Sequence, residues 1–262
     1  MKSFLDKWQA FAKSSILAEQ ENSQTIDLSG FKINETLEPR VWTQNKRLEV
    51  LVRRKLIDIA NQFWESLDLP TVKIEDITFT GSLANYNWSR YSDVDLHILV
   101  DFNLLPGDEE ITKAMMNARR AMWNNKHDIE VFGYEVEIYV QDSNEVHHST
   151  GVYSVLRDHW LVEPQRKLFT IDEQNVKLKA RHVMKQIDKI EVQAEAGNYH
   201  EVITDVDRLK EKIRKFRKCG LESGGEYSPE NLAFKVLRRN LYLEKLSKLK
   251  TQAYDRIMSM SQ

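Results

Sequence analysis

The chain has 262 residues, a hydrophobic fraction of 41% and a formal net charge of −2, which allow one large domain or two modest ones. No apolar stretch approaches the roughly 20 residues of a membrane-spanning helix, and Asp6, Lys7 and Lys13 stand where a signal peptide would be apolar. The single cysteine, Cys219, excludes an internal disulfide and any multi-cysteine zinc site. The composition therefore predicts an ordered cytoplasmic protein with no membrane partner.

Charge is distributed unevenly along the chain. Residues 171–262 carry 19 Lys and Arg against 14 Asp and Glu, whereas residues 1–170 carry 19 against 26. An acidic half joined to a basic half would suit a cleft that binds a metal on one wall and phosphates on the other. The counts alone, however, favour an ordinary solvated surface.

The N-terminal part begins with a predicted helix over residues 3–18, in which Phe4, Trp8, Phe11 and Ile16 recur near the helical period. The polar residues that follow read as a linker, so residues 1–25 form a helix and linker that we expect to dock on the rest of the chain.

Residues 26–168 alternate helical and strand patterns. Apolar residues at helical spacing predict a helix over residues 46–67, with Leu51 in its apolar stripe, and period-two alternation predicts a strand over residues 74–80. A second strand is expected from residue 93, then a helix over about 108–125, and strand alternation returns in residues 128–142. The residues expected on the apolar face of the 108–125 helix are Ile111, Met115, Ala118 and Met122.

From about residue 171 the pattern is helical throughout. We expect helices over residues 172–195, 199–219 and 228–258, with Gly220 as the residue that ends the second. The predicted fold class is therefore α+β: a small mixed sheet packed with helices in residues 26–168, followed by an all-helical domain in residues 169–262.

The most informative stretch is FTGSLANYNWSRYSDVDLHILVDF, residues 79–102. Asp93 and Asp95 lie two apart on a predicted strand, so both carboxylates project from one face. Two adjacent carboxylates repel each other, and a divalent cation such as Mg²⁺ or Mn²⁺ would resolve that conflict. Upstream, the turn at Gly81 and Ser82 can bring backbone N–H groups and a hydroxyl close to a phosphate.

A strand followed by Gly-Ser, about ten residues and then Asp-x-Asp within an apolar strand resembles the DNA polymerase β-like nucleotidyltransferase superfamily. The run GSLANYNWSRYSDVDLHI is similar to uncharacterised nucleotidyltransferase-like proteins of tailed phages. The specific resemblance covers about 60 residues, from Phe79 to Gln141. It implies that the sheet domain has the palm fold of these polymerases.

The superfamily pattern also requires a third carboxylate on a later, neighbouring strand. The segment YEVEIYV offers Glu135 and Glu137 on its polar face. We expect Glu137 to be the third acid, because it lies deeper in the apolar alternation, and keep Glu135 as the alternative. Both glutamates could instead be solvated residues of an edge strand.

The resemblance implies two Mg²⁺ or Mn²⁺ ions held by Asp93, Asp95 and Glu137. Gly81 and Ser82, with Ser92 beside them, would bind the phosphates of a nucleoside triphosphate. The product would be a nucleoside monophosphate joined to an acceptor hydroxyl, with release of pyrophosphate. RNA, a second nucleotide and a small molecule all remain possible acceptors.

Basic residues of the helical half add weaker candidates. Lys235 lies on a helix face with Arg238 and Arg239 and could reach the triphosphate, although a solvated helix face explains it nearly as well. The run RLKEKIRKFRK, residues 208–218, could follow a nucleic-acid backbone. We favour a plain amphipathic helix there, with Phe216 among its inward residues.

Two further alternatives stay open. His97 shares the polar strand face with the aspartates, so it either borders the metal site or is a buried, hydrogen-bonded histidine. The chain as a whole could also be a catalytically inactive relative that binds a nucleotide or nucleic acid as a sensor or scaffold.

Overall fold

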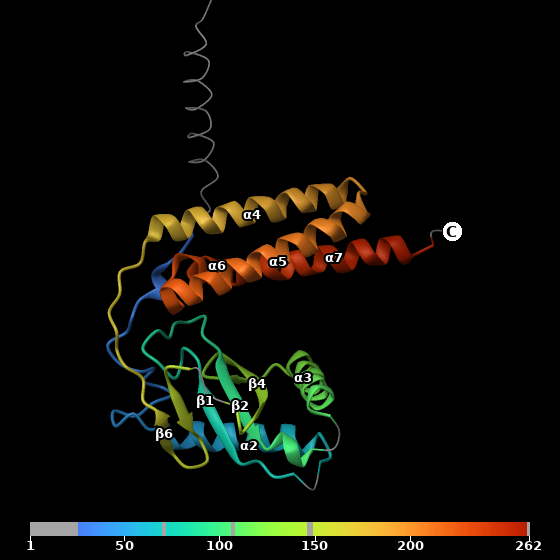
Figure 1. Cartoon of the computed structure of the whole chain (residues 1–262). Coiled ribbons are helices and arrows are strands. Elements are labelled where there is room, and N and C mark those ends of the chain that lie inside the picture. The colour runs from blue at the N-terminus through green and yellow to red at the C-terminus, as the bar shows by residue number, and fades with distance from the viewer. Residues whose placement is uncertain (1–25, 70–71, 106–107, 146–148, 261–262) are drawn as a thin grey trace, which may run out of the picture. The chain divides into compact units, whose positions relative to one another are not determined.

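The computed structural model describes residues 26–69, 72–105, 108–145 and 149–260 (Figure 1). The helix expected over residues 3–18 therefore lies outside the described residues. The chain divides into two compact units, one formed by Ser29–Leu168 and the other by Met1–Leu28 with Phe169–Gln262. Each unit is considered by itself below.

The described residues form a mixed α and β structure, with one six-stranded mixed sheet and six α-helices. In this part of the chain, no helix combines the length and the apolar character that crossing a membrane requires.

The unit Ser29–Leu168 contains the whole sheet, in the strand order β3-β4-β2-β1-β5-β6. Strands β2 and β4 run parallel, and every other neighbouring pair is antiparallel. The strands are β1 Asp76–Thr80, β2 Val94–Val100, β3 Glu130–Val131, β4 Tyr134–Asp142, β5 Val152–Ser154 and β6 His159–Val162. The helices of this unit are η1 Ser29–Phe31, α2 Val50–Glu65, η2 Phe102–Leu104 and α3 Glu109–Lys126.

One face of the sheet is apolar and forms the core. Phe79 of β1 and Leu96 of β2 are paired and fully buried on this face, as alternation along each strand requires. Helices α2 and α3 pack against the sheet (Figure 1), and Phe63 of α2 meets Trp123 of α3 edge to face, with ring centroids 5.5 Å apart. The opposite face of the sheet is thereby left to the polar side chains of the same strands.

The apolar stripes expected for these two helices are partly wrong. Leu51 of α2 is 74% exposed, and the face expected for α3 is turned outward, with Ile111 68% exposed. Thr112 and Met116 are buried instead. Near the C-terminal end of α3, the Asn124 side chain bonds both the N–H and the carbonyl of Ile138 in β4, each at 3.2 Å. These bonds fix the rotation of α3 about its axis, and therefore which of its faces meets the sheet.

Strands β5 and β6 were not expected from the sequence, because they are short and carry little alternation. Aromatic packing holds them in place: Tyr153 of β5 packs edge to face on Trp160 of β6. Trp42 stacks on Trp160 and on Phe79, at centroid distances of 4.6 and 5.5 Å. Its indole N–H also donates to the Leu83 carbonyl at 2.7 Å, which fixes the chain just after the Gly81-Ser82 turn.

The second unit contains α4 Glu173–Glu195, α5 Tyr199–Gly224, η3 Gly225–Tyr227, α6 Pro229–Arg239 and α7 Tyr242–Met258. The single helix expected over residues 228–258 is wrong, since the chain breaks at Leu241 in a left-handed conformation with φ of 60°. Gly220 does not end α5 either. It lies within the helix, where an added Cβ would stand 2.4 Å from the Cβ of Glu230, so this glycine allows α5 and α6 to approach closely.

Candidate functional site

Polar side chains form two rows across the strands β1, β2 and β4. Thr80, Asp95 and Glu137 occupy paired positions on the three strands and make one row. The second row is two residues away on each strand and consists of Thr78, His97 and Tyr139. Because paired residues of neighbouring strands project from the same face, both rows lie on the face away from the aromatic core.

Four carboxylates gather where β2 and β4 begin. The two strands are parallel, so both begin at the same edge of the sheet. The register pairs Asp95 with Glu137 and Val94 with Val136. Asp93 and Glu135 each come one residue before this last pair, so they lie opposite each other at the start of the two strands. Neighbouring strands lie about 4.8 Å apart. The structure therefore brings both predicted aspartates close to both candidate glutamates.

The charges of these carboxylates act on one another. Partial loss of its water shell raises the pKa of Glu135, and the negative charges of Glu137 and Asp93 raise it further. Glu135 is exposed, whereas Asp93, Asp95 and Glu137 are half-buried. Glu137 is thus the glutamate that is both paired with Asp95 and partly shielded from water.

Tyr139 bonds directly to Glu137, an interaction that the sequence analysis did not anticipate. Its hydroxyl donates to the Glu137 carboxylate, and burial, followed by this bond, raises the pKa of Tyr139. The Tyr139 ring stacks on His97 at 4.9 Å and lies 4.7 Å from the Arg120 guanidinium. The signal for Tyr139 was present in the sequence, since it lies two residues after Glu137 on the same strand face.

His97 borders this cluster through its ring. Its Nδ1 lies 3.1 Å from the side-chain oxygen of Gln141 and its imidazole is half-buried. The hydrogen bond expected for His97 is therefore present, whereas its place beside a metal stays a prediction.

The Gly81-Ser82 turn follows β1 directly and lies against Asp95. Gly81 has φ of 78°, and an added Cβ would stand 1.8 Å from Oδ2 of Asp95. Only glycine fits here, because the conformation is left-handed and the carboxylate occupies the space of a side chain. The backbone of the turn and the Asp95 carboxylate are thus immediate neighbours.

A serine pair closes the loop between the turn and β2. The hydroxyl of Ser82 bonds the hydroxyl of Ser92 at 2.7 Å, and the Ser92 oxygen accepts from the backbone N–H of Ser89 at 3.0 Å. Ser92 is buried. It therefore fixes the position of the Ser82 hydroxyl.

The basic candidates lie in the other unit. Lys235 is on α6, half-buried, and pairs with Glu226 at 2.9 Å. Because the units are considered separately, its contact with a triphosphate stays a prediction. In the run 208–218, Arg214 pairs with Glu211 at 2.7 Å, and the Arg217 guanidinium lies 4.2 Å from the Phe234 ring.

The donor chemistry of the acidic cluster suits a hard divalent cation, because carboxylate oxygens are the ligands that Mg²⁺ and Mn²⁺ prefer. As the side chains stand, however, no three His, Cys, Asp or Glu residues in the described ranges lie close enough together to hold an ion. Glu137 instead accepts from Tyr139, and Asp95 lies against Gly81. The residues fit a cation by type and by register, and their side chains would have to turn toward it.

No protein-family model matches the chain, and searches of curated proteins and of solved structures likewise give no match. An assignment of function therefore depends on the residues and geometry described above.

Removing one charge from the cluster should stabilise the metal-free protein. We expect Glu135→Gln to raise the melting temperature by about 1–2 °C at pH 7 with a chelator present, because it relieves like-charge repulsion at an exposed position. The raised pKa of Glu135 means that the folded chain binds this proton more tightly than the unfolded chain does. Below the ordinary glutamate pKa of 4.5 the side chain is protonated in both states, so the gain in melting temperature should vanish there.

Differential scanning calorimetry at pH 7 and pH 4 measures this effect. Asp58→Asn, which removes an exposed carboxylate on α2, is the control and should change little at either pH. A lower melting temperature for Glu135→Gln at pH 7 would show that Glu135 makes a stabilising contact instead.

Proposed function

We propose that this chain is a metal-dependent nucleotidyltransferase with a polymerase β-like palm. It would transfer a nucleoside monophosphate from a nucleoside triphosphate to an acceptor hydroxyl and release pyrophosphate. The observation that carries the proposal is the pairing of Asp95 with Glu137 on parallel strands, directly beside the left-handed turn at Gly81. Sequence motif and strand register point to the same residues.

The phosphate end of the substrate would bind at the turn. The left-handed conformation at Gly81 lets the turn lie directly against Asp95, and the backbone N–H groups of such a turn attract anions. The Ser82 hydroxyl, held by Ser92 at 2.7 Å, would bind a phosphate oxygen. Loss of the Ser92 hydroxyl should therefore weaken triphosphate binding without removing any group from the reacting atoms.

The carboxylates beside the turn would act on the α-phosphate. Asp93, Asp95 and Glu137 would hold Mg²⁺ or Mn²⁺, two ions being expected. Bound cations would lower the pKa of the acceptor hydroxyl and offset the charge of the leaving pyrophosphate. Glu137 would accept the proton that the acceptor oxygen loses as its bond to phosphorus forms and the bond to pyrophosphate breaks.

The acceptor is the open part of the proposal. RNA, a second nucleotide and a small molecule are all compatible with a hydroxyl presented to Glu137. A cytoplasmic site of action, expected from the composition, likewise stays a prediction.

A second candidate is a catalytically inactive relative that binds a nucleotide or nucleic acid as a sensor or scaffold. The observation in its favour is that Tyr139 holds the Glu137 carboxylate, so the third acid is engaged within the protein. Tight nucleotide binding with no pyrophosphate release, with Mg²⁺ or with Mn²⁺, would support this candidate over the enzyme.

Removing either aspartate should abolish turnover. We expect Asp93→Asn and Asp95→Asn each to lower the rate of pyrophosphate release by about 10³-fold or more, because each removes a charge that stabilises the transition state. The assay incubates the purified chain with each nucleoside triphosphate, with Mg²⁺ or Mn²⁺, with and without total RNA as acceptor. Asp58→Asn is the matched control and should keep full activity. Retained activity in the Asp93→Asn/Asp95→Asn double variant would overturn the metal assignment.

The two glutamates should behave differently. Glu137→Gln should lower kcat by at least about 100-fold, whereas Glu135→Gln should lower it by less than about fivefold, because only Glu137 is paired with Asp95. Steady-state kinetics of both variants in one assay measures the contrast. Equal losses, or the reverse order, would assign the third acid to Glu135.

A further inference from the structure

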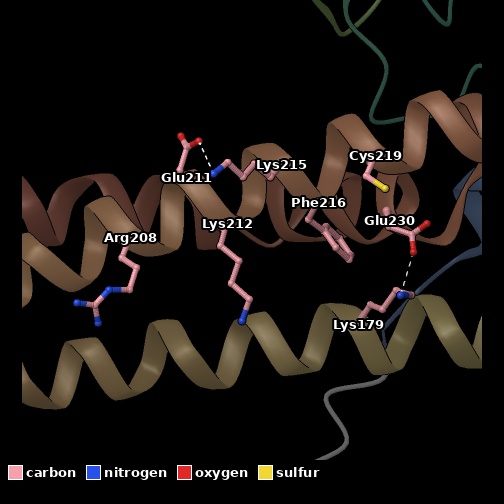
Figure 2. A pocket seen from close by; sticks show the side chains of 8 residues that line it. All are labelled: Lys179, Arg208, Glu211, Lys212, Lys215, Phe216, Cys219 and Glu230. Carbon is pink, nitrogen blue, oxygen red and sulfur yellow. Dashed lines mark ion pairs between the residues drawn. The ribbon is translucent and has the colours of Figure 1, made fainter.

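The helical unit carries a surface groove between α4 and α5. Two adjoining hollows of ≈ 620 and ≈ 390 Å³ share Lys179, Lys212 and Phe216. Figure 2 shows the Phe216 ring facing into the groove, and Lys179 paired with Glu230 at one end at 2.9 Å. The sequence analysis expected Phe216 to face inward. It is half-buried instead and lines a surface groove.

This groove has an apolar floor and a charged rim. Leu178 is 67% exposed and Phe216 is half-buried, whereas the other apolar residues that line it are buried. The charged residues that line it are Lys179, Arg208, Glu211, Lys212, Lys215 and Glu230. The apolar residues that line the groove are Leu178, Val183, Leu209, Ile213 and Phe216. An apolar segment that covered Leu178 and Phe216 would remove their apolar area from water.

The chain itself leads a segment to one end of this groove. Ile26 and Leu28 are only 8% and 7% exposed and belong to the helical unit. In Figure 1 the blue ribbon starts beside the first turns of α4, and in Figure 2 it passes near the pair of Lys179 and Glu230. Residues 1–25 precede that point.

The length and pattern of this segment match the groove. A helix over residues 3–18 would place Phe4, Trp8, Phe11 and Ile16 along one face, and Phe4 would lie about 18 Å from Ile16. The groove extends along α5 from Arg208 to Cys219, a span of about 16 Å. Residues 19–25 can bridge up to about 23 Å between the helix and Ile26.

We infer that residues 3–18 form an amphipathic helix that lies in the α4–α5 groove and covers Phe216. Its C-terminal end would lie at the Cys219 end of the groove, where the chain continues to Ile26. This inference concerns the helical unit alone and is independent of the proposed nucleotidyl transfer.

The single cysteine provides the probe. Cys219 is exposed and lines the groove in the described part of the chain, so the docked helix should slow its alkylation by iodoacetamide. In the full-length chain, Trp8→Asp/Phe11→Asp should raise the alkylation rate about tenfold, as expected if the segment covers the groove about nine-tenths of the time. Ala10→Asp/Leu17→Asp adds the same charge to the opposite helix face and should leave the rate within about twofold.

A second variant tests the groove side. Leu178→Asp replaces an exposed residue and should raise the rate as much as Trp8→Asp/Phe11→Asp, with circular dichroism confirming that each variant is folded. Equal rates for the wild-type chain and both groove-directed variants would overturn the inference. Protection that grows with protein concentration would also overturn it and identify a second copy as the occupant. Protection that appears only on adding single-stranded RNA would identify nucleic acid instead.

Discussion

The parallel pairing of β2 with β4 is the constraint on which the candidate site depends. It aligns Asp95 with Glu137 and brings the beginnings of both strands to one edge of the sheet. The antiparallel pairing of β1 with β2 then brings Thr80, and the Gly81 turn that follows it, to the same edge. A shift of one residue in either register would turn the carboxylates toward the aromatic core, where their burial without partners would cost several kcal/mol. The core packing of Phe79 and Leu96 therefore also fixes the geometry of the polar face.

The sequence predicted those elements whose pattern is set locally. Alternation in VDLHILV predicts β2, and helical spacing followed by Pro70 predicts the helix that the structure places at Val50–Glu65. It did not predict β5 and β6, because Tyr153 and Trp160 are held by Trp42 from a distant part of the chain. Nor did it predict the break at Leu241, since no proline or glycine marks that left-handed residue.

The same distinction applies to the candidate site. Gly81, Asp93 and Asp95 could be identified from spacing, because a turn and one strand place them. The apolar alternation favoured Glu137 over Glu135, but the pairing of Glu137 with Asp95 and its partial burial depend on register and packing. The Tyr139 bond to Glu137 and the groove around Phe216 depend on side-chain directions that only packing decides.

Anomalous scattering from crystals grown with Mn²⁺ and a non-hydrolysable nucleoside triphosphate analogue tests the proposed function most directly. The account predicts manganese peaks bounded by the carboxylates of Asp93, Asp95 and Glu137, with the triphosphate on the Gly81-Ser82 turn and the Glu137 carboxylate released from Tyr139. Manganese bound elsewhere, or a nucleotide bound away from this turn, would contradict the assignment of this sheet edge as a nucleotidyl-transfer site.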